Sequence, residues 1–200
     1  MALAEARLGA GKGFKNILCL TLGTGIGGGI LLNNQILRGE HFSAAEVGHI
    51  IVHHNGKKCA CGNKGCLEAY GSAPAMIKRY RSKFKRLSLA YDADKLSTEY
   101  IFQKAAKQEP LALETIAETC GYLGAGIASI ANIIDPEVVI IGGGVAEAGD
   151  GFIQQIGRQV KQYSITTIMQ PLKVVKAHLG NDAGMVGAIL LAAENYLKKE

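Results

Sequence analysis

The chain has no apolar run long enough to cross a bilayer and no secretory leader at its start. Residues 1–8 instead have the pattern of a short helix with charged side chains. Internal repeats, low-complexity tracts and clear linkers are also missing, so 200 residues fit one large domain or two small ones. Of only five cysteines, Cys19 and Cys120 stand among apolar residues, which favours buried thiols and a reducing compartment. We therefore expect a cytoplasmic protein that contacts no membrane.

The other three cysteines fall within eight residues, and a histidine precedes the first of them by ten positions. These four residues are His49, Cys59, Cys61 and Cys66. Thiolates and an imidazole are ligands of tetrahedral zinc, and two glycines between the last two cysteines allow a tight turn. An accidental cluster, or a disulfide with a spare thiol, is the alternative. Because protein side chains fill all four positions, we expect a structural zinc ion with no open position for water.

The hydrophobic pattern predicts an α/β protein. Helices are expected over residues 1–8, 67–87 (in two stretches, the second starting near Pro74), 97–108, 110–134, 150–163 and 183–198. Strands are expected over residues 17–22, 30–32, 35–37, 138–141 and 174–175. The order of strand, loop, helix and strand in the second half predicts parallel pairing there.

Two glycine-rich segments that follow predicted strands are candidates for phosphate binding. Residues 22–29 read LGTGIGGG, in which missing Cβ atoms let backbone amides approach an anion. A strand follows this segment, which excludes a Rossmann fingerprint, and it lacks the Gly-Lys-Ser/Thr of a Walker A loop. Residues 142–144 are all glycine and end a buried strand, where open α/β sheets bind ligands. A plain glycine-rich hairpin and a plain strand-to-helix loop are the alternatives.

Residues 78–86 are the densest basic segment of a chain whose net charge is +5. Met76, Tyr80 and Phe84 recur every four residues, which places them on one helix face and predicts that the basic side chains cover the solvent face. We prefer this interpretation to a zinc-stabilised nucleic-acid-binding module, in which the same segment would contact phosphates.

Two carboxylates bracket the predicted metal loop. Glu46 stands three residues before His49, and Glu68 stands two residues after Cys66. A metal loop would hold both carboxylates in fixed positions, suited to accept hydrogen bonds from sugar hydroxyls. The alternatives are surface acids or, for Glu68, a charge at the start of a helix.

The order of these features is more specific than any one of them. The glycine hairpin, then Ala-Glu-Val-Gly-His at 45–49, then Cys-x-Cys-Gly-x-x-Gly-Cys-x-Glu at 59–68, then the late triple glycine resemble the ROK family over essentially the whole chain. That family comprises bacterial repressors and sugar kinases, among them glucokinases and N-acetylmannosamine kinases. The resemblance implies an actin-like, ribonuclease-H-like ATPase fold, in which ATP with Mg²⁺ and a sugar meet between two lobes.

The resemblance also implies roles for individual residues. The sugar hydroxyls would be bound by Glu46, His49 and Glu68. Zinc would be held by His49, Cys59, Cys61 and Cys66, with His49 using different ring nitrogens for zinc and sugar. ATP would contact Gly23, Thr24 and Gly25 in the family's second phosphate-binding loop, and Gly142, Gly143 and Gly144 beside the adenosine. Zinc would fix the sugar pocket without taking part in phosphoryl transfer.

The sequence departs from the family pattern at its start. ROK kinases begin with an Asp-x-Gly-x-Thr phosphate loop, and their general base is an aspartate just ahead of an Ala-rich helix. The first aspartate here is Asp92, so we assign no catalytic residue. Because phosphoryl transfer needs a clamped nucleotide and an oriented nucleophile, we predict the C-terminal lobe of a hexose or N-acetylhexosamine kinase that is inactive alone. The alternative is the sugar-sensing domain of a ROK repressor.

The same comparison predicts how the chain divides. Residues 1–182 would form the lobe, with the zinc loop at 46–68, and residues 183–200 would form a terminal helix that packs on the absent N-terminal lobe. The apolar side chains left exposed on that helix would be Met185, Ile189, Ala192, Ala193 and Tyr196. An exposed apolar patch favours self-association. We therefore expect a homo-oligomer that binds sugar and ATP and does not bind nucleic acid.

Overall fold

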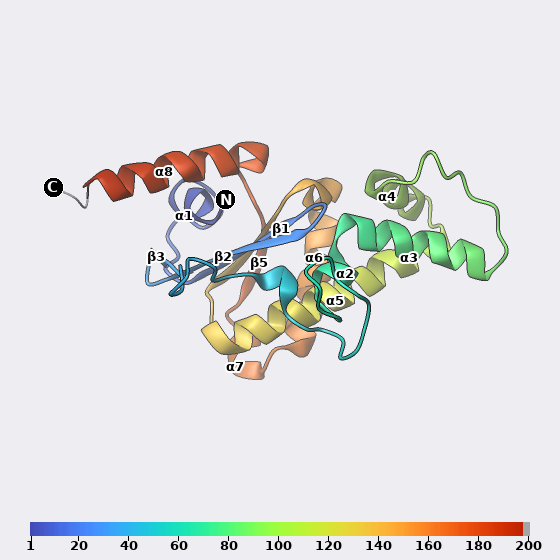
Figure 1. Cartoon of the computed structure of the whole chain (residues 1–200), viewed down its shortest axis with the longest axis horizontal. Coiled ribbons are helices and arrows are strands. Elements are labelled where there is room, and N and C mark those ends of the chain that lie inside the picture. Colours follow the sequence, from blue (N-terminus) through green and yellow to red (C-terminus); the bar gives the residue numbers. More distant parts are fainter. Residues whose placement is uncertain (198–200) are drawn as a thin grey trace.

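A five-stranded sheet runs through the centre of the computed structural model, which describes residues 1–197 without the side chains of Asn181 and residues 194–197 (Figure 1). The strands are β1 (Ile17–Leu22), β2 (Ile26–Leu32), β3 (Gln35–Ile36), β4 (Val138–Gly142) and β5 (Lys173–Lys176). Their order across the sheet is β3-β2-β1-β4-β5. The first three pair antiparallel, whereas β4 is parallel to both β1 and β5. The parallel pairing predicted for the second half is thus confirmed.

Helices connect the strands at nearly all the predicted places. The α-helices are α1 (Ala2–Leu8), α2 (Glu68–Gly71), α3 (Ala73–Arg86), α4 (Thr98–Ala106), α5 (Pro110–Ile134), α6 (Asp150–Tyr163), α7 (Thr166–Met169) and α8 (Ala183–Leu197). The 3-10 helices are η1 (Val47–His49), η2 (Gly144–Ala148) and η3 (Gly180–Asp182). The short α7 and the 3-10 helices were not predicted, and the predicted end of the last helix at residue 198 lies outside the described residues. Within the described part of the chain, every helix is too short or too polar to span a membrane.

Helices cover both faces of the sheet: α5 and α6 lie on one face, and α1 with α8 on the other (Figure 1). Side chains alternate along a strand. In β1, Leu18 and Leu20 therefore join the large core beside α5, while Ile17 and Cys19 join the smaller core beside α1. Burial on both faces explains why β1 is apolar almost throughout.

Strand β2 begins earlier than predicted, because the glycines at 27–29 belong to the strand and not to the preceding loop. Neighbouring segments pack directly on them. A Cβ atom added at Gly28 would lie 2.4 Å from the carbonyl oxygen of Ala45, and one at Gly29 would lie 2.6 Å from Cβ of Ala2. These glycines let the chain ahead of η1, and helix α1, approach the sheet closely.

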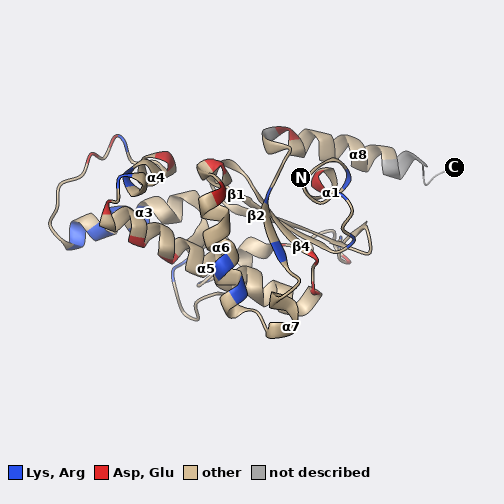
Figure 2. Cartoon of the chain, turned by 180° about the vertical axis from the view of Figure 1, so that it is seen from behind, with Lys and Arg blue, Asp and Glu red and all other residues tan. Residues whose placement is uncertain are grey.

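The prediction that all basic side chains of α3 face solvent is wrong, although its predicted apolar face is confirmed. Arg79 and Lys83 are buried against α5. There the Nε atom of Arg79 lies 3.2 Å from Glu118, and Nζ of Lys83 lies 2.7 Å from Glu114 and 2.6 Å from Glu118. The exposed basic residues that remain gather toward the C-terminal end of α3 (Figure 2).

Helix α8 packs along α1 (Figure 1). It exposes apolar side chains away from this contact. A Cβ atom added at Gly187 would lie 3.7 Å from Cβ of Ala4, which shows how closely the two helices approach. Met185 is 64% exposed and Ile189 is 63% exposed. The side chain of Tyr196, predicted to share this surface, lies outside the described residues. Docking of α8 on a further lobe stays a prediction.

Candidate functional site

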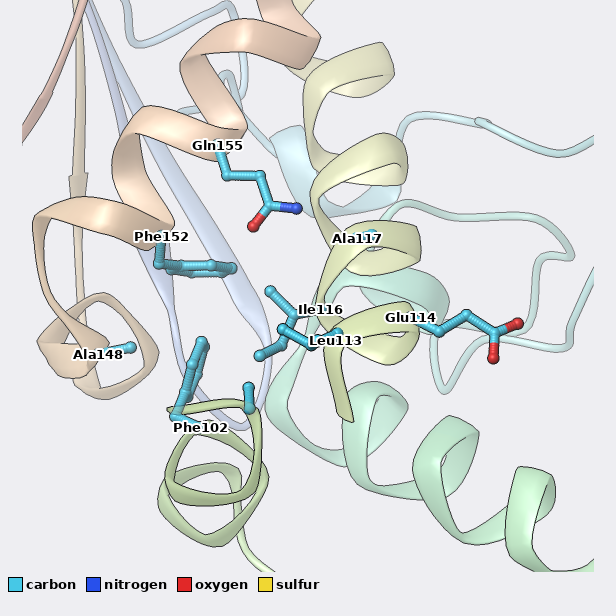
Figure 3. A pocket seen from close by; sticks show the side chains of 9 residues that line it. Phe102, Leu113, Glu114, Ile116, Ala117, Ala148, Phe152 and Gln155 are labelled. Carbon is cyan, nitrogen blue, oxygen red and sulfur yellow. The ribbon is translucent and has the colours of Figure 1, made fainter. Parts of the chain in front are cut away.

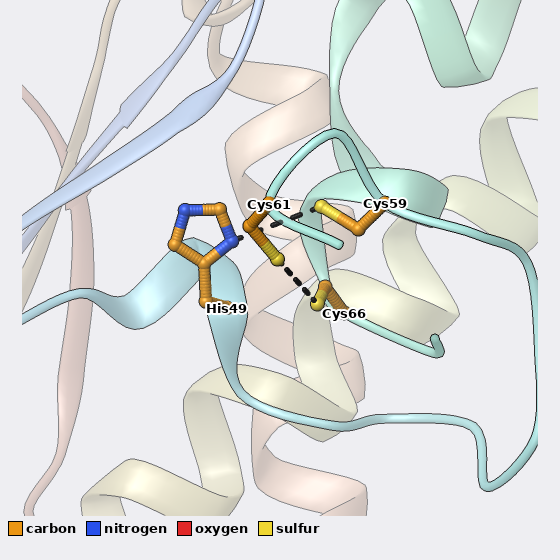
Figure 4. Close-up of side chains that lie close together, drawn as sticks. All are labelled: His49, Cys59, Cys61 and Cys66. Carbon is orange, nitrogen blue, oxygen red and sulfur yellow. Dashed lines mark hydrogen bonds between the residues drawn. The ribbon is translucent and has the colours of Figure 1, made fainter. Parts of the chain in front are cut away.

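The four predicted metal ligands come together at one point (Figure 4). His49 ends η1, and the three cysteines stand on the loop between η1 and α2. The four ligand atoms lie within 4.8 Å of one another. Gly62 and Gly65 adopt φ angles of 99° and 86°, which favour glycine, and a Cβ atom at Gly65 would lie 2.0 Å from the carbonyl oxygen of His53. The loop therefore needs glycine at residue 65 to close around the ligands.

Two of the distances between these atoms are those expected around a tetrahedral zinc ion. Sγ of Cys61 lies 3.6 Å from Sγ of Cys66, and Sγ of Cys59 lies 3.8 Å from Nδ1 of His49. Zn–S bonds of about 2.3 Å and Zn–N bonds of about 2.0 Å at tetrahedral angles separate neighbouring ligand atoms by roughly 3.5–3.8 Å. All five cysteines are free, so the disulfide alternative does not hold in this structure. Bound there, zinc would act as a structural ion that ties the loop to η1.

Two of the thiols lie in contrasting environments. Burial raises the pKa of Cys66 to about 12, whereas the backbone N–H of Asn63 lowers the pKa of the exposed Cys61. Metal ligands of this kind must be thiolates. A metal ion that binds here therefore displaces a proton from Cys66, and its affinity should rise with pH.

His49 presents its two ring nitrogens to different neighbours. Nδ1 faces the cysteines, while Nε2 lies 3.9 Å from Oε2 of Glu46. The side chain of Glu46 is 67% exposed and that of His49 is 34% exposed. A ligand that approaches from solvent can therefore meet Glu46 and Nε2 while a metal ion occupies the Nδ1 side.

Glu68 joins the metal loop to the glycine hairpin. Its Oε2 accepts a hydrogen bond from the backbone N–H of Ile26 at 3.0 Å, and its Oε1 accepts one from the thiol of Cys59 at 3.7 Å. A Cβ atom at Gly25 would lie 2.5 Å from Oε2, so glycine there makes room for the carboxylate. The position of Glu68 is thus set by the turn between β1 and β2.

The two glycine loops lie side by side at one edge of the sheet. Because β1 and β4 are parallel, with Thr21 opposite Gly142, both strands end at this edge. Gly143 then passes directly against Leu22 with a φ angle of 88°. A Cβ atom at Gly143 would lie 2.4 Å from the carbonyl oxygen of Leu22, so the close approach requires glycine.

Both loops also keep open space on their outer side. A Cβ atom added at Gly23 or Gly144 would meet no atom within 4 Å, and Thr24 is exposed. The turn itself is fixed, since the N–H of Gly23 donates to the carbonyl of Gly25 at 3.0 Å. The carbonyl of Gly23 in turn accepts from the N–H of Ala73, at the start of α3, at 2.9 Å. Rigid glycine turns with free outer faces are suited to bind an anion.

A cavity of about 220 Å³ adjoins Gly144, between η2 and α4. Besides Gly144 it is lined by Thr98, Glu99, Phe102, Val145, Glu147 and Ala148. A second cavity of about 500 Å³ shares Phe102 and Ala148 with it, and Phe152 also lines it beside Phe102 (Figure 3). The rings of Phe102 and Phe152 pack edge to face at 5.1 Å. Apolar cavities beside a glycine loop are typical of sites for flat ligands with phosphate groups.

Sequence reasoning missed two residues that support the metal loop, Tyr70 and Arg79. The guanidinium of Arg79 donates to the carbonyl of Tyr70 at 2.8 Å and to Oγ1 of Thr119 at 2.6 Å. Burial lowers the pKa of Arg79, and the nearby Glu118 opposes this shift. One sequence signal could have indicated the pairing: the buried cations of α3 and their acidic partners on α5 are each spaced by four residues.

Comparisons with known proteins place this geometry in a family. The family model described as "ROK family" matches residues 1–195. The chain belongs to the ROK family. It is 38% identical to a glucokinase of Halalkalibacterium halodurans over 99% of the chain. It is 29% identical to the xylose repressor of Bacillus subtilis over 98% of the chain. The crystal structure of a ROK family glucokinase from Streptomyces griseus, in complex with glucose and AMPPNP, matches 95% of the chain with a TM-score of 0.85 and 35% identity.

These matches confirm the predicted fold, the mixed α/β sheet of ROK sugar kinases with its actin-like topology. They also show that this ROK chain is shorter than its relatives. It spans 63% of the H. halodurans glucokinase, 64% of the S. griseus structure and 49% of the xylose repressor. Kinases and repressors both match along nearly its whole length.

Proposed function

We propose that the chain is the ATP- and sugar-binding lobe of a ROK-type kinase that transfers the γ-phosphoryl group of ATP to a hexose or N-acetylhexosamine. One observation carries the proposal: the hairpin turn of residues 22–26 contacts both halves of the candidate site. On one side Gly25 and Ile26 hold Glu68, beside the metal loop. On the other side Leu22 packs on Gly143, beside the cavities. A sugar and a nucleotide bound at these two places would meet across a single turn.

The sugar would be bound by Glu46, His49 and Glu68. Carboxylates accept hydrogen bonds from hydroxyls, and the neutral imidazole can donate or accept at Nε2. The nucleotide would be bound by Gly23, Thr24, Gly25, Gly142, Gly143 and Gly144, with Mg²⁺ accompanying its phosphates. The likeness to the S. griseus glucokinase, whose structure holds glucose and AMPPNP, supports both assignments.

Zinc, held by His49, Cys59, Cys61 and Cys66, would contribute to the sugar site through Glu68. As a thiol, Cys59 donates a hydrogen bond to Oε1 of Glu68. A metal-bound thiolate carries no hydrogen, so Oε1 would lose this donor and be free to accept one from a sugar hydroxyl. The bond from Ile26 to Oε2 would meanwhile keep the carboxylate in place. We therefore expect glucose to bind the zinc-loaded chain more tightly than the metal-free chain in titration calorimetry; equal affinities would contradict this role.

We further propose that the chain alone does not transfer phosphate, since we assign no general base to it. The test is ATP-dependent phosphorylation of glucose, N-acetylglucosamine and N-acetylmannosamine by the zinc-loaded chain, with zinc content and circular dichroism measured on the same sample. We expect sugar binding without turnover. Turnover above the rate of a Glu68→Gln control would show that a base is present and would refute the proposed inactivity.

A sugar-sensing domain of a ROK repressor is the second candidate, and the match to the xylose repressor favours it. Nucleotide binding distinguishes the two. A kinase lobe should bind a non-hydrolysable ATP analogue, and Gly144→Val should abolish that binding, because the added side chain would enter the open space beside the cavity. A sensor domain should bind sugar but no nucleotide, even at millimolar concentration.

We also propose that residues 1–182 form the lobe proper and that residues 183–200 serve to dock it. The exposed Met185 and Ile189 on α8 support this division. They also support a homo-oligomer as the state of the isolated chain, since exposed apolar patches favour association. We propose a cytoplasmic location and no binding of nucleic acid, in keeping with buried Arg79 and Lys83, which cannot contact phosphates.

A further inference from the structure

We propose that Tyr70 is a positioning residue that latches the metal loop onto helix α2. Its hydroxyl accepts a hydrogen bond from the backbone N–H of Lys57 at 2.7 Å. Lys57 lies on the metal loop, two residues before Cys59. Tyr70 itself is only 4% exposed and stands on α2, two residues after Glu68. The phenol therefore connects the loop that carries the ligands to the helix that carries the carboxylate.

Lys57, the residue that Tyr70 contacts, makes hydrogen bonds through both its backbone N–H and its carbonyl. The carbonyl of Lys57 accepts a hydrogen bond from the N–H of Gly65 at 2.8 Å, and Gly65 directly precedes Cys66. Tyr70 holds the amide of Lys57 while Lys57 holds the segment of Cys66. Loss of the hydrogen bond to the hydroxyl would thus release the backbone that leads to Cys59. It would also weaken the hydrogen bond between Lys57 and Gly65, next to Cys66.

The loop also packs around the ring of Tyr70. The imidazole of His53 stacks on it with ring centres 5.7 Å apart, and Nζ of Lys57 lies 4.8 Å from its centre. A Cβ atom added at Gly56 would lie 2.0 Å from the phenol oxygen. Glycine at residue 56 is therefore what lets the loop pass over the hydroxyl.

Helices α3 and α5 hold Tyr70 from the other side. The ring of Tyr122, on α5, packs at 4.3 Å between centres. The carbonyl of Tyr70 accepts from the buried Arg79 of α3, which is itself anchored by Thr119 and Glu118. Tyr70 stands on α2, is held by two further helices and is bonded to a loop whose own strand-like pairing is limited to isolated bridges, so it can fix where that loop sits.

This inference rests on the proposed metal site, so its test separates the two. The variants are Tyr70→Phe, which removes only the hydroxyl, and Tyr122→Phe, a matched control that makes the same change on the stacked ring. Amide hydrogen exchange at Lys57 is measured in the metal-free chain, with the amides of Leu123 and Ile127 in α5 as references for global opening. Zinc release to a chromogenic chelator is then measured in the zinc-loaded chain.

We expect Tyr70→Phe to exchange the Lys57 amide up to about tenfold faster, because one hydrogen bond is lost. Zinc release should also be about tenfold faster, at the lower end of the losses in metal affinity seen when residues that orient metal ligands are changed. The α5 amides should not change, and Tyr122→Phe should match the unaltered chain in every measurement. Gly56→Ala should reproduce the effect, because its methyl group displaces the hydroxyl. Unchanged Lys57 exchange in Tyr70→Phe, or equal acceleration at Lys57 and in α5, would overturn the latch. If the unaltered chain binds no zinc, the metal assignment fails, and Lys57 exchange alone decides the role of Tyr70.

Discussion

Glu5 is the most deeply buried carboxylate in the described part of the chain, with 0% exposure, and its loss should be costly. Its Oε2 accepts from the N–H of Ala10 at 2.8 Å and of His178 at 3.1 Å, and its Oε1 accepts from the N–H of Leu179 at 2.8 Å. One side chain of α1 thereby satisfies three amides and ties α1 to the segment that leads into α8. In Glu5→Gln, an amide NH₂ replaces one of the two accepting oxygens.

The best arrangement of that glutamine keeps its oxygen on Ala10 and His178 and turns its NH₂ toward Leu179. One buried N–H then lacks an acceptor, at about 1–3 kcal/mol, and two charge-assisted bonds become neutral ones. We expect Glu5→Gln to lower the free energy of unfolding by about 3 kcal/mol, which is roughly 6–12 °C in Tm for a chain of this size. Thermal unfolding followed by circular dichroism measures the shift.

Glu137→Gln is the matched control for this experiment. Glu137 also accepts two backbone N–H groups, from Lys15 at 2.6 Å and from Asn16 at 2.8 Å, but it is exposed and uses a single oxygen for both. A glutamine can keep both bonds there, so we expect a loss below about 1 kcal/mol. A melting temperature for Glu5→Gln within about 2 °C of the unaltered chain, or no lower than that of Glu137→Gln, would refute this prediction. The hydrogen bonds that Glu5 accepts from backbone N–H groups would then contribute little to stability.

Three further outcomes are expected. Cys61→Ser should lose the single zinc ion and disorder the metal loop that leads to Glu68; retention of one zinc per chain by elemental analysis would contradict the ligand assignment. Burial raises the pKa of Cys120 from 9.0 to about 12, so between these pH values the thiol ionises in the unfolded chain but not in the folded one. The free energy of unfolding should therefore fall as the pH rises through this range, by up to about 1.4 kcal/mol per pH unit more than in Cys120→Ala. Urea unfolding at each pH measures this difference, and the same pH dependence in both proteins would refute it. The isolated chain should be a dimer or larger in light scattering, and Met185→Glu with Ile189→Glu should make it a monomer; a monomeric unaltered chain would exclude association through α8.

The sequence pattern predicted the strands and the long helices well, because their apolar residues follow a clear period. It failed for the cations of α3, since a basic run interrupted by aromatics has the same pattern whether or not acids face it. Arg79 and Lys83 are buried because Glu114 and Glu118 face them from α5, and that packing is a tertiary contact across at least 31 residues of sequence. Buried charges of this kind persist only when they are paired.

The sequence predicted which residues form the candidate site, but only partly how they are arranged in space. The spacing of His49 and the cysteines indicated a shared metal ion, because few other arrangements use those side chains together. The contacts that orient the site, such as the bond from Tyr70 to Lys57, join residues whose types carry no signal of their own. Such contacts follow from the packing of α2 against α3 and α5, which the sequence pattern alone does not specify.

Gly25 and Gly144 have different surroundings, and the sequence could not separate them. At Gly25 a Cβ atom would strike Oε2 of Glu68, whereas at Gly144 it would meet no atom within 4 Å. Gly25→Ala should therefore displace the carboxylate from the N–H of Ile26 and cost about 1–3 kcal/mol of folding stability. Gly144→Ala should leave the free energy of unfolding, measured in urea, unchanged within about 0.5 kcal/mol and weaken only the binding of a nucleotide. Equal destabilisation by both changes would mean that the loop beside the cavity is packed and not open to a ligand.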